Sequence, residues 1–203
     1  TASSASYLNK LSHQHILLTG GTGLIGQQLT GMLLAEGYTV SCLSRHPARQ
    51  QGVKTFAWNV AKKQIDETCI AGVDVIVHLA GADIAGKRWT DKRKKEIIDS
   101  RAGAIRLIYD LLKNKKHQVK RVISASGISY YGSRGDQVQT EDCPPACDFL
   151  GKCCVEWEAA VDEGEMLGLK TLKFRTVMVL CRRHGALPKL ALPVKLGRGS
   201  PLG

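Results

Sequence analysis

The sequence predicts an α/β fold built on a doubly wound parallel sheet, and three observations lead to this prediction. Short apolar runs alternate along the chain with stretches that carry Leu and Ile at helical spacing. A glycine-rich turn joins the first apolar run to the first helical stretch. The run at residues 73–79 (VDVIVHL) is almost continuously apolar, which is typical of a strand covered on both faces. Strands that alternate with helices form βαβ units, and such units build a parallel sheet.

The expected elements follow one another along the chain in this alternation. Strands are expected at residues 15–19, 38–43, 55–57, 73–79, 121–126 and 170–179. Helices are expected at residues 24–36, 91–112 and 149–167, the second of them as one long helix. The first helix is expected to stop at Gly37, because glycine readily adopts the backbone conformation that ends a helix.

The chain has 203 residues, which suits one domain, or one domain and part of a second. We expect a flexible N-terminal tail at 1–14 and a nucleotide-binding domain at 15–180. Residues 181–203 are expected to be the start of a truncated region, because their helix and loop have nothing to close against. No apolar run reaches the ~18 residues of a membrane-spanning helix.

Seven cysteines, an odd number with no signal peptide before them, predict free thiols in a reducing intracellular compartment. That compartment is the cytoplasm, or a mitochondrion or plastid if the Ser-rich N-terminus is the remnant of a transit peptide. The cysteines at 143, 147, 153 and 154 do not have zinc-site spacing, so no metal site is expected.

The charge balance is strongly basic, with a formal net charge of +11. Basic runs occur at residues 87–95 (KRWTDKRKK) and 113–121 (KNKKHQVKR). Such a surface suits nucleotide phosphates, an acidic protein partner, nucleic acid or an anionic membrane, and it equally suits solvated helix faces. No specific nucleic-acid partner is expected, because there is no helix-turn-helix or zinc-finger spacing and only 5% of the residues are aromatic.

The glycine turn is the strongest motif in the chain. Gly20, Gly23 and Gly26 form a GxxGxxG pattern between a strand and a helix. The first two glycines allow a tight turn that a pyrophosphate can approach, and the third lets the helix pack closely. The helix N-terminus then offers N–H groups and a partial positive charge to phosphates. The motif predicts dinucleotide binding in a Rossmann-type fold, and its alternative is a tight turn with no ligand.

The residues at the end of the second strand indicate which dinucleotide the protein binds. An acidic residue there hydrogen-bonds the ribose hydroxyls of NAD, whereas this chain has Ser44, Arg45 and His46. The planar fork of Arg45 suits a 2′-phosphate, so NADPH (NADP) is preferred over NADH (NAD). The alternative is that Arg45 is a solvated loop charge.

Several motifs together carry a family resemblance. ILLTGGTGLIG, SRHP, HLAGADIAGKRWTDKRKKEIIDSR, SASGISYYG, TEDCPPACDFLGKCCVEWEAA, FRTVMVL and LGRGSPLG occur in this order. The chain resembles the extended short-chain dehydrogenase/reductase superfamily and, within it, the atypical NAD(P)-dependent epimerase-like (YfcH-like) family. The resemblance covers about residues 15–203. Members of that family are longer, which implies that residues 181–203 are the start of a truncated substrate-binding region and that much of a substrate domain is absent here.

The resemblance implies a role for each matching position. The pyrophosphate would be lined by Gly20, Thr22, Gly23, Leu24, Ile25 and Gly26. Ser44 and Arg45 would hold the adenosine 2′-phosphate. The strand tip with Leu79, Ala80 and Gly81 would pass under the adenine-side ribose. The next strand tip, with Ser124, Ala125 and Ser126, would face the nicotinamide, and Ser100 stands where an Asn is usual.

The catalytic position departs from the superfamily pattern. The usual Tyr-x-x-x-Lys pair is replaced by Phe149 and Cys153, and Phe has no group that titrates. Tyr130 or Tyr131 could act instead, with Ser126 nearby, and Ser126 and Tyr131 are taken as the catalytic candidates. Lys152 is one residue out of register, about 100° around the helix, so it is expected to point elsewhere.

Two function classes stay open at this point. The first is an NADPH-dependent oxidoreductase or epimerase-like enzyme acting on a small carbonyl compound or a nucleotide sugar. The second is a catalytically silent protein that holds NADPH as a structural or sensor subunit of a larger assembly. A nucleic-acid or membrane-surface binder is a minor third. His78 is expected to be a satisfied core histidine, and Trp89 and Trp157 are expected to be packing residues on helices.

Overall fold

A computed structural model describes residues 14–47, 51–84 and 86–181, together with residues 187, 188, 191, 195 and 197. Residues 1–13 of the expected tail and most of the expected region at 181–203 lie outside these residues. Within the described part of the chain, no helix is both long and apolar enough to cross a membrane.

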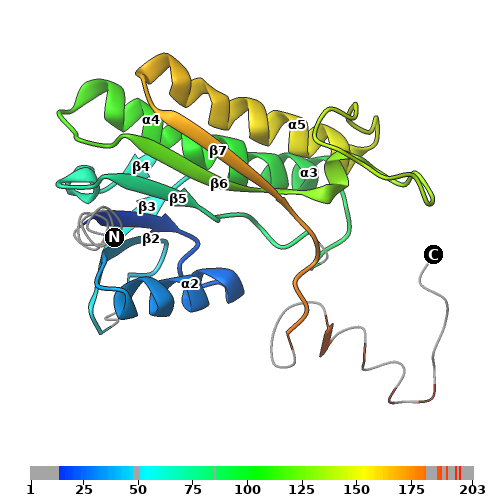
Figure 1. Ribbon diagram of the computed structural model, residues 1–203, viewed down its shortest axis with the longest axis horizontal. Helices are drawn as coiled ribbons and strands as arrows, with labels where there is room; N and C mark the ends of the chain where they lie inside the picture. The colour runs from blue at the N-terminus through cyan, green and yellow to red at the C-terminus, as the bar shows by residue number, and fades with distance from the viewer. Residues whose placement is uncertain are drawn as a thin grey trace, which may run out of the picture.

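Seven strands form one sheet (Figure 1). They are β1 (His15–Thr19), β2 (Thr39–Ser44), β3 (Val53–Asn59), β4 (Gln64–Ile65), β5 (Val75–His78), β6 (Arg121–Gly127) and β7 (Lys170–Thr176). Their order across the sheet is β4-β3-β2-β1-β5-β6-β7. All neighbours are parallel except β3 and β4, which are antiparallel. The predicted doubly wound α/β fold is confirmed.

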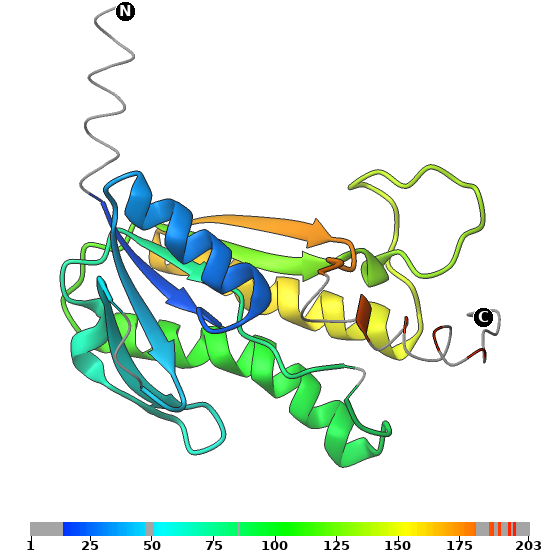
Figure 2. The same ribbon diagram turned by 90° about the horizontal axis from the view of Figure 1, so that it is seen from below.

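Helices cover both faces of this sheet. They are α2 (Leu24–Ala35), α3 (Asp91–Ile98), α4 (Ala104–Asn114) and α5 (Phe149–Asp162). Figure 2 shows α2 on one side of the sheet and the other three helices on the opposite side. The strand order reverses at β1, because the chain places β2 and β3 on one side of it and β5 to β7 on the other. Ligands of such sheets bind at the carboxyl ends of the strands next to this reversal.

The core lies between the central strands and the α4–α5 layer. All four residues of β5 are buried, as the continuous apolar run predicted. The side chains of Ile105, Ile108 and Tyr109 on α4 are 1% exposed or less, and Val161 of α5 packs in the same cluster. This buried apolar surface holds the sheet edge and its loops in fixed positions.

The predicted single helix at 91–112 is wrong in one respect. A π-helical turn at Asp99–Gly103 separates α3 from α4. The Arg101 carbonyl in this turn accepts hydrogen bonds from the Ala104 N–H and, at 3.1 Å, from His78 Nε2 of the sheet. Such turns are rare and occur often at functional sites. Trp89 also lies outside a helix, because it precedes Thr90, the residue that caps α3.

Candidate functional site

The glycine turn after β1 is closed to side chains at two positions. Gly20 has φ +73°, and a Cβ there would lie 2.8 Å from the Leu79 carbonyl oxygen. A Cβ on Gly26 would lie 2.3 Å from the carbonyl oxygen of Gly20. The backbone N–H of Gly23 donates to the same Gly20 oxygen at 3.0 Å, which closes the turn. The turn therefore has this shape only because Gly20 and Gly26 lack side chains.

The N-terminus of α2 faces out of this turn without a cap. Its N-cap residue, Gly23, makes no side-chain hydrogen bond, and the first helical turn holds no acidic residue. The first N–H groups of the helix and its partial positive charge are therefore free for an anion. Thr22 and Ile25 are exposed beside it, and Leu24 is half-buried. The residues present fit the pyrophosphate of a dinucleotide.

The end of β2 lies beside the glycine turn, because Leu43 pairs with Thr19. The Ser44 hydroxyl donates to the His46 carbonyl oxygen at 3.0 Å and accepts from the His46 N–H at 3.2 Å. This hydroxyl therefore shapes the turn. Arg45 is exposed and forms no ion pair with any residue in the described ranges, so its guanidinium is available to a ligand.

The end of β5 is fixed by a buried hydrogen-bond chain that starts at His78. Since His78 Nε2 donates to a carbonyl oxygen, its Nδ1 accepts from the Thr19 hydroxyl at 2.8 Å. The Thr19 oxygen in turn accepts the N–H groups of Leu79 and Ala80, both at 3.1 Å. Burial lowers the pKa of His78 to about 4, so the ring is neutral near pH 7. The expectation of a satisfied core histidine is confirmed, and the chain holds Leu79 and Ala80 against the glycine turn.

The tip of β6 does not present its three candidate residues together. Ser124 and Ser126 are buried on the α5 side of the strand, whereas Ala125 lies half-buried on the other face. Side chains alternate along a strand, so three consecutive ones cannot face one ligand. The contact of this segment with the nicotinamide stays a prediction, and the burial of both serines favours its backbone atoms as the contacts.

Ser126 and Tyr131 are nevertheless joined through two residues that sequence reasoning missed. The Ser126 hydroxyl donates to Glu158 Oε1 at 2.6 Å. Arg175 holds the same carboxylate with two hydrogen bonds, of 2.9 Å and 2.8 Å. A third arginine nitrogen, Nη1, donates to the Tyr131 hydroxyl oxygen at 2.8 Å. We call these four residues the Arg175 network.

The electrostatics of the Arg175 network favour a charged pair. Burial raises the pKa of Glu158, but hydrogen bonds from Arg175 and Ser126 outweigh it, and the pKa lies below its ordinary value. The hydrogen bond to Glu158 raises the pKa of Arg175. Arg175 also stacks on Tyr130, with its guanidinium carbon 3.5 Å from the ring centroid. The network is rigid and charge-balanced at neutral pH.

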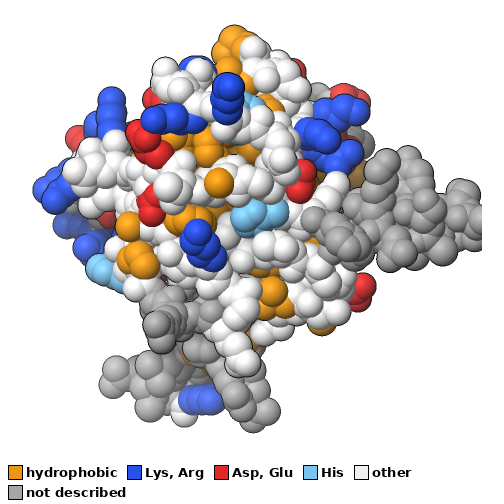
Figure 3. Space-filling view, turned by 90° about the vertical axis from the view of Figure 1, so that its left-hand side faces the viewer, with side chains coloured by type: hydrophobic (Ala, Val, Ile, Leu, Met, Phe, Trp, Pro, Cys, Tyr) orange, Lys and Arg blue, Asp and Glu red, His pale blue; other side chains and the backbone are white. Residues whose placement is uncertain are grey.

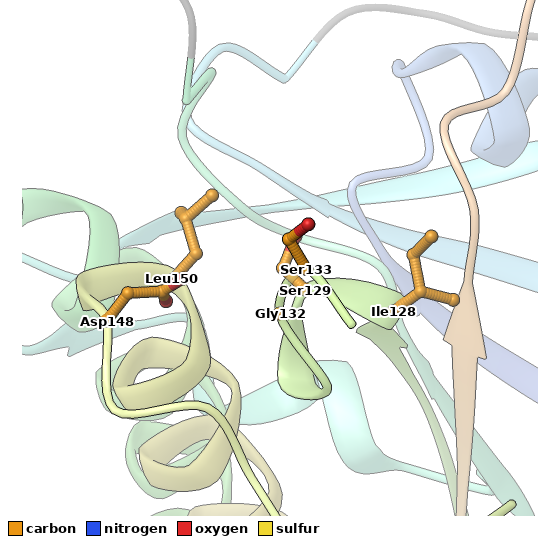
Figure 4. A pocket seen from close by; sticks show the side chains of 6 residues that line it. All are labelled: Ile128, Ser129, Gly132, Ser133, Asp148 and Leu150. Carbon is orange, nitrogen blue, oxygen red and sulfur yellow. The ribbon is translucent and has the colours of Figure 1, made fainter. Parts of the chain in front are cut away.

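An open pocket adjoins the network at the start of α5 (Figure 4). Its volume is about 310 Å³, and it is lined by Ile128, Ser129, Gly132, Ser133, Asp148 and Leu150. A second pocket of about 470 Å³ shares part of this lining and reaches Tyr131. The lining mixes hydroxyl and carboxylate groups with two apolar side chains, which suits a hydroxylated ligand.

The two positions that depart from the superfamily pattern have packing roles. The ring of Phe149 meets that of Trp89 edge-on, with centroids 5.1 Å apart, and Lys94 Nζ lies 5.6 Å from the Phe149 centroid. Cys153 is 3% exposed, and burial raises the pKa of its thiol. Lys152 is exposed. Neither position offers a proton donor in place of the usual tyrosine.

The basic surface is divided into groups. On the face shown in Figure 3, Lys and Arg side chains lie in several clusters with acidic side chains between them. In the two basic runs, Lys95 pairs with Asp99, and Lys115 pairs with Glu67, both at 2.6 Å. Exposed ion pairs of this kind contribute little to stability, but they reduce the local positive field.

Comparisons with known proteins agree with this geometry. The sequence model of the NAD dependent epimerase/dehydratase family matches residues 16–157. The epimerase family protein YfhF of Bacillus subtilis is 35% identical over 191 residues, which are 93% of this chain and 62% of that protein. The chain thus spans about three fifths of the length of this curated relative.

Two solved structures are similar to the chain. The nucleoside-diphosphate sugar epimerase of Corynebacterium glutamicum matches with a TM-score of 0.77 and 29% identity, over 99% of this chain and 42% of that one. The human epimerase family protein SDR39U1 (isoform2), solved with NADPH, matches with a TM-score of 0.72 and 28% identity, over 93% of this chain and 62% of that one. By its family match and its relatives, this chain belongs to the NAD dependent epimerase/dehydratase family.

Proposed function

We propose that this protein binds NADPH at the carboxyl edge of its sheet, in preference to NADH. One observation carries the proposal: a glycine turn closed to side chains leads into an uncapped helix, and at the end of the neighbouring strand lies the exposed Arg45, which has no ion pair within the described ranges. A 2′-phosphate satisfies this arginine, and NADH has none. The human relative solved with NADPH supports the same choice.

The strand order supports a placement of the two halves of the dinucleotide on different sides of β1. Arg45 follows β2, so the adenosine half lies over β2. Dinucleotides cross the sheet where the strand order reverses, so the other half lies over β5 and β6. Leu79, Ala80 and Gly81 follow β5, so they contact the middle of the dinucleotide and its distal half. This proposal differs from the contact with the adenine-side ribose that the family resemblance implies.

We propose carbonyl chemistry on a small carbonyl compound or a nucleotide sugar, the substrate class printed for the Corynebacterium relative. A bound nicotinamide supplies or accepts a hydride. Tyr131 is the proton donor from this chain, since Arg175 donates to its oxygen and leaves the phenol hydrogen for a substrate oxygen. The pocket beside Tyr131 offers Ser129, Ser133 and Asp148 to sugar hydroxyls.

A second candidate function is NADPH binding without turnover, in a structural or sensor subunit of a larger assembly. Phe149 and Cys153 favour it, because both are packed where the superfamily keeps its proton-transfer pair. The commitment of the Ser126 hydroxyl to Glu158 favours it as well. The exposed Lys87, Arg88 and Lys92 would then meet an acidic protein surface.

Mass spectrometry of the molecule released on denaturation tests the cofactor, and a panel of carbonyl compounds and nucleotide sugars tests turnover. The enzyme proposal expects NADPH that is consumed, with Tyr131→Phe about 100-fold slower at unchanged NADPH affinity. Tyr130→Phe is the matched control. Arg175 stacks on the ring of Tyr130 and forms no hydrogen bond with its hydroxyl, so phenylalanine keeps this contact. NADPH that is never consumed supports the silent subunit, and failure to bind any dinucleotide overturns both candidates.

A further inference from the structure

Arg101 is a buried cation in the π-helical turn between α3 and α4. It is 8% exposed, and no carboxylate forms an ion pair with it among the described residues. Its Nη1 donates to the Ile97 carbonyl oxygen at 2.9 Å and to the Ser100 hydroxyl at 3.3 Å, and its Nη2 donates to the Ala82 carbonyl oxygen at 3.1 Å. All of these partners are neutral.

Keeping such a charge inside the protein is unfavourable for stability. A buried ion needs a counter-charge or a full set of hydrogen bonds to balance the loss of water. The ring of Trp157, with its centroid 5.3 Å from the guanidinium carbon, gives partial compensation. Burial lowers the pKa of Arg101, yet a guanidinium remains charged near pH 7. An unfavourable buried charge of this kind is typical of a residue that binds a ligand.

The Nε–Nη2 edge of the guanidinium lies against Gly81. A Cβ on Gly81 would lie 2.9 Å from Cζ, 3.0 Å from Nη2 and 3.2 Å from Nε of Arg101. The hydrogen bonds named above leave the Nε–H without a partner within the described ranges. Gly81 itself is exposed. The fork formed by Nε and Nη2 therefore lies next to an exposed backbone position, and a side chain at position 81 would collide with it.

Arg101 also acts on the position from which the superfamily's lysine is missing. Its positive charge lowers the pKa of the Cys153 thiol against the larger effect of burial, so the two groups are electrostatic neighbours. The site thus keeps a cation near this position, although it comes from the turn before α4 and not from α5.

We propose that Arg101 is a dinucleotide-binding residue whose Nε–Nη2 fork donates to the vicinal hydroxyls of the distal ribose, the one that carries the nicotinamide. This inference rests on the proposed dinucleotide site. Gly81 lies two residues beyond Leu79, whose carbonyl abuts the glycine turn, and on the side of β1 away from Arg45. A dinucleotide anchored at the turn and at Arg45 therefore brings its distal half over Gly81. Paired hydroxyls match a planar fork with two donors.

Three ligands separate the two halves of the site in equilibrium titrations: NADPH, 2′-phospho-ADP-ribose and adenosine 2′,5′-bisphosphate. The first two carry the distal ribose, and the third ends before it. Arg101→Met is expected to lower the affinity for NADPH and for 2′-phospho-ADP-ribose by about tenfold or more. Its affinity for adenosine 2′,5′-bisphosphate is expected to stay within about twofold of the wild-type value. Gly81→Ala is expected to give the same pattern by displacing the guanidinium, which serves the test if Arg101→Met fails to fold.

Arg106→Met is the matched control, because Arg106 lies on α4 and pairs with Glu156 and Glu163 away from the sheet edge. It is expected to change none of the three affinities. Unchanged NADPH affinity in folded Arg101→Met overturns the inference, and so does an equal loss for all three ligands, which indicates a structural role. Wild-type protein that binds none of the three overturns the dinucleotide site itself.

Discussion

Backbone groups form one side of the proposed site, whereas side chains form the other. The side formed by β1, α2 and β2 is made of backbone, because glycines shape the turn and an uncapped helix faces out of it. The side formed by β6, α5 and β7 is made of side chains, because the Arg175 network draws on four segments. A backbone site depends on neighbours in sequence, whereas a side-chain network depends on how the whole sheet assembles. Changes on the two sides should therefore have different consequences.

The largest effect is expected from Gly26→Ala on the backbone side. The new Cβ would lie 2.3 Å from the carbonyl oxygen of Gly20, which cannot move without opening the turn. We expect loss of NADPH binding and a fall of about 3 kcal/mol in the free energy of unfolding. Titration with NADPH and urea unfolding measure the two effects.

Gly31→Ala is the matched control on the same helix. A Cβ at Gly31 would meet nothing within 4 Å, so alanine should stabilise α2 by about 0.5–1 kcal/mol and leave NADPH affinity unchanged. Equal behaviour of the two variants would contradict the claim that the turn is closed at Gly26.

Glu158→Gln should disrupt the Arg175 network, which forms the other side of the site. Glu158 is 7% exposed, and its loss of charge leaves Arg175 without its carboxylate. We expect the free energy of unfolding to fall by about 3 kcal/mol, with NADPH affinity little changed. Glu156→Gln, whose side chain is 45% exposed and pairs with Arg106, should cost less than about 1 kcal/mol. Similar costs for both would show that the network is no stronger than a surface ion pair.

His78 lies between the two sides and should make the fold sensitive to acid. Its pKa falls from 6.5 to about 4 on folding, so below about pH 6.5 the unfolded state takes up a proton that the folded state does not. Stability therefore decreases as the pH falls through this window. Compared with His78→Gln, the wild-type protein should lose about 2–3 kcal/mol more between roughly pH 7 and pH 4.5 in urea unfolding. Parallel pH profiles of the two proteins would refute the neutral buried histidine.

Arg45→Ala should give the smallest free-energy change and the most selective one. Removal of a charge-assisted pair with the 2′-phosphate should weaken NADPH binding by roughly 1.5–3 kcal/mol and leave NADH binding nearly unchanged. Isothermal titration with both cofactors measures the difference. Equal losses for NADPH and NADH would remove Arg45 from the 2′-phosphate site.

Most of the fold could be predicted from local patterns. Apolar runs placed the main strands, and the glycine turn placed α2. The break at Asp99–Gly103 could not be predicted from helical spacing, since the apolar pattern continues through it and its contact with His78 comes from a distant strand. The two-residue strand β4 escaped notice because its pairing with β3 is set by a turn and not by apolar periodicity.

Only the part of the site formed by the glycine turn and the end of β2 could be predicted from the sequence. The three glycines and Arg45 are close in sequence, and their roles follow from spacing. Glu158 gave one signal that was not used: it stands four residues after Cys154 on the buried face of α5, where an acidic side chain needs a partner. Arg175 gave no signal, since its pairing depends on the parallel alignment of β6 and β7.

Equilibrium titration of the wild-type protein with NADPH and with NADH tests the central claim most directly. The account predicts binding of both cofactors at one site per chain, with NADPH tighter by about tenfold or more because only NADPH carries the 2′-phosphate that Arg45 meets. Equal affinities would contradict the role of Arg45. Absence of binding would contradict the assignment of the glycine turn as a dinucleotide site.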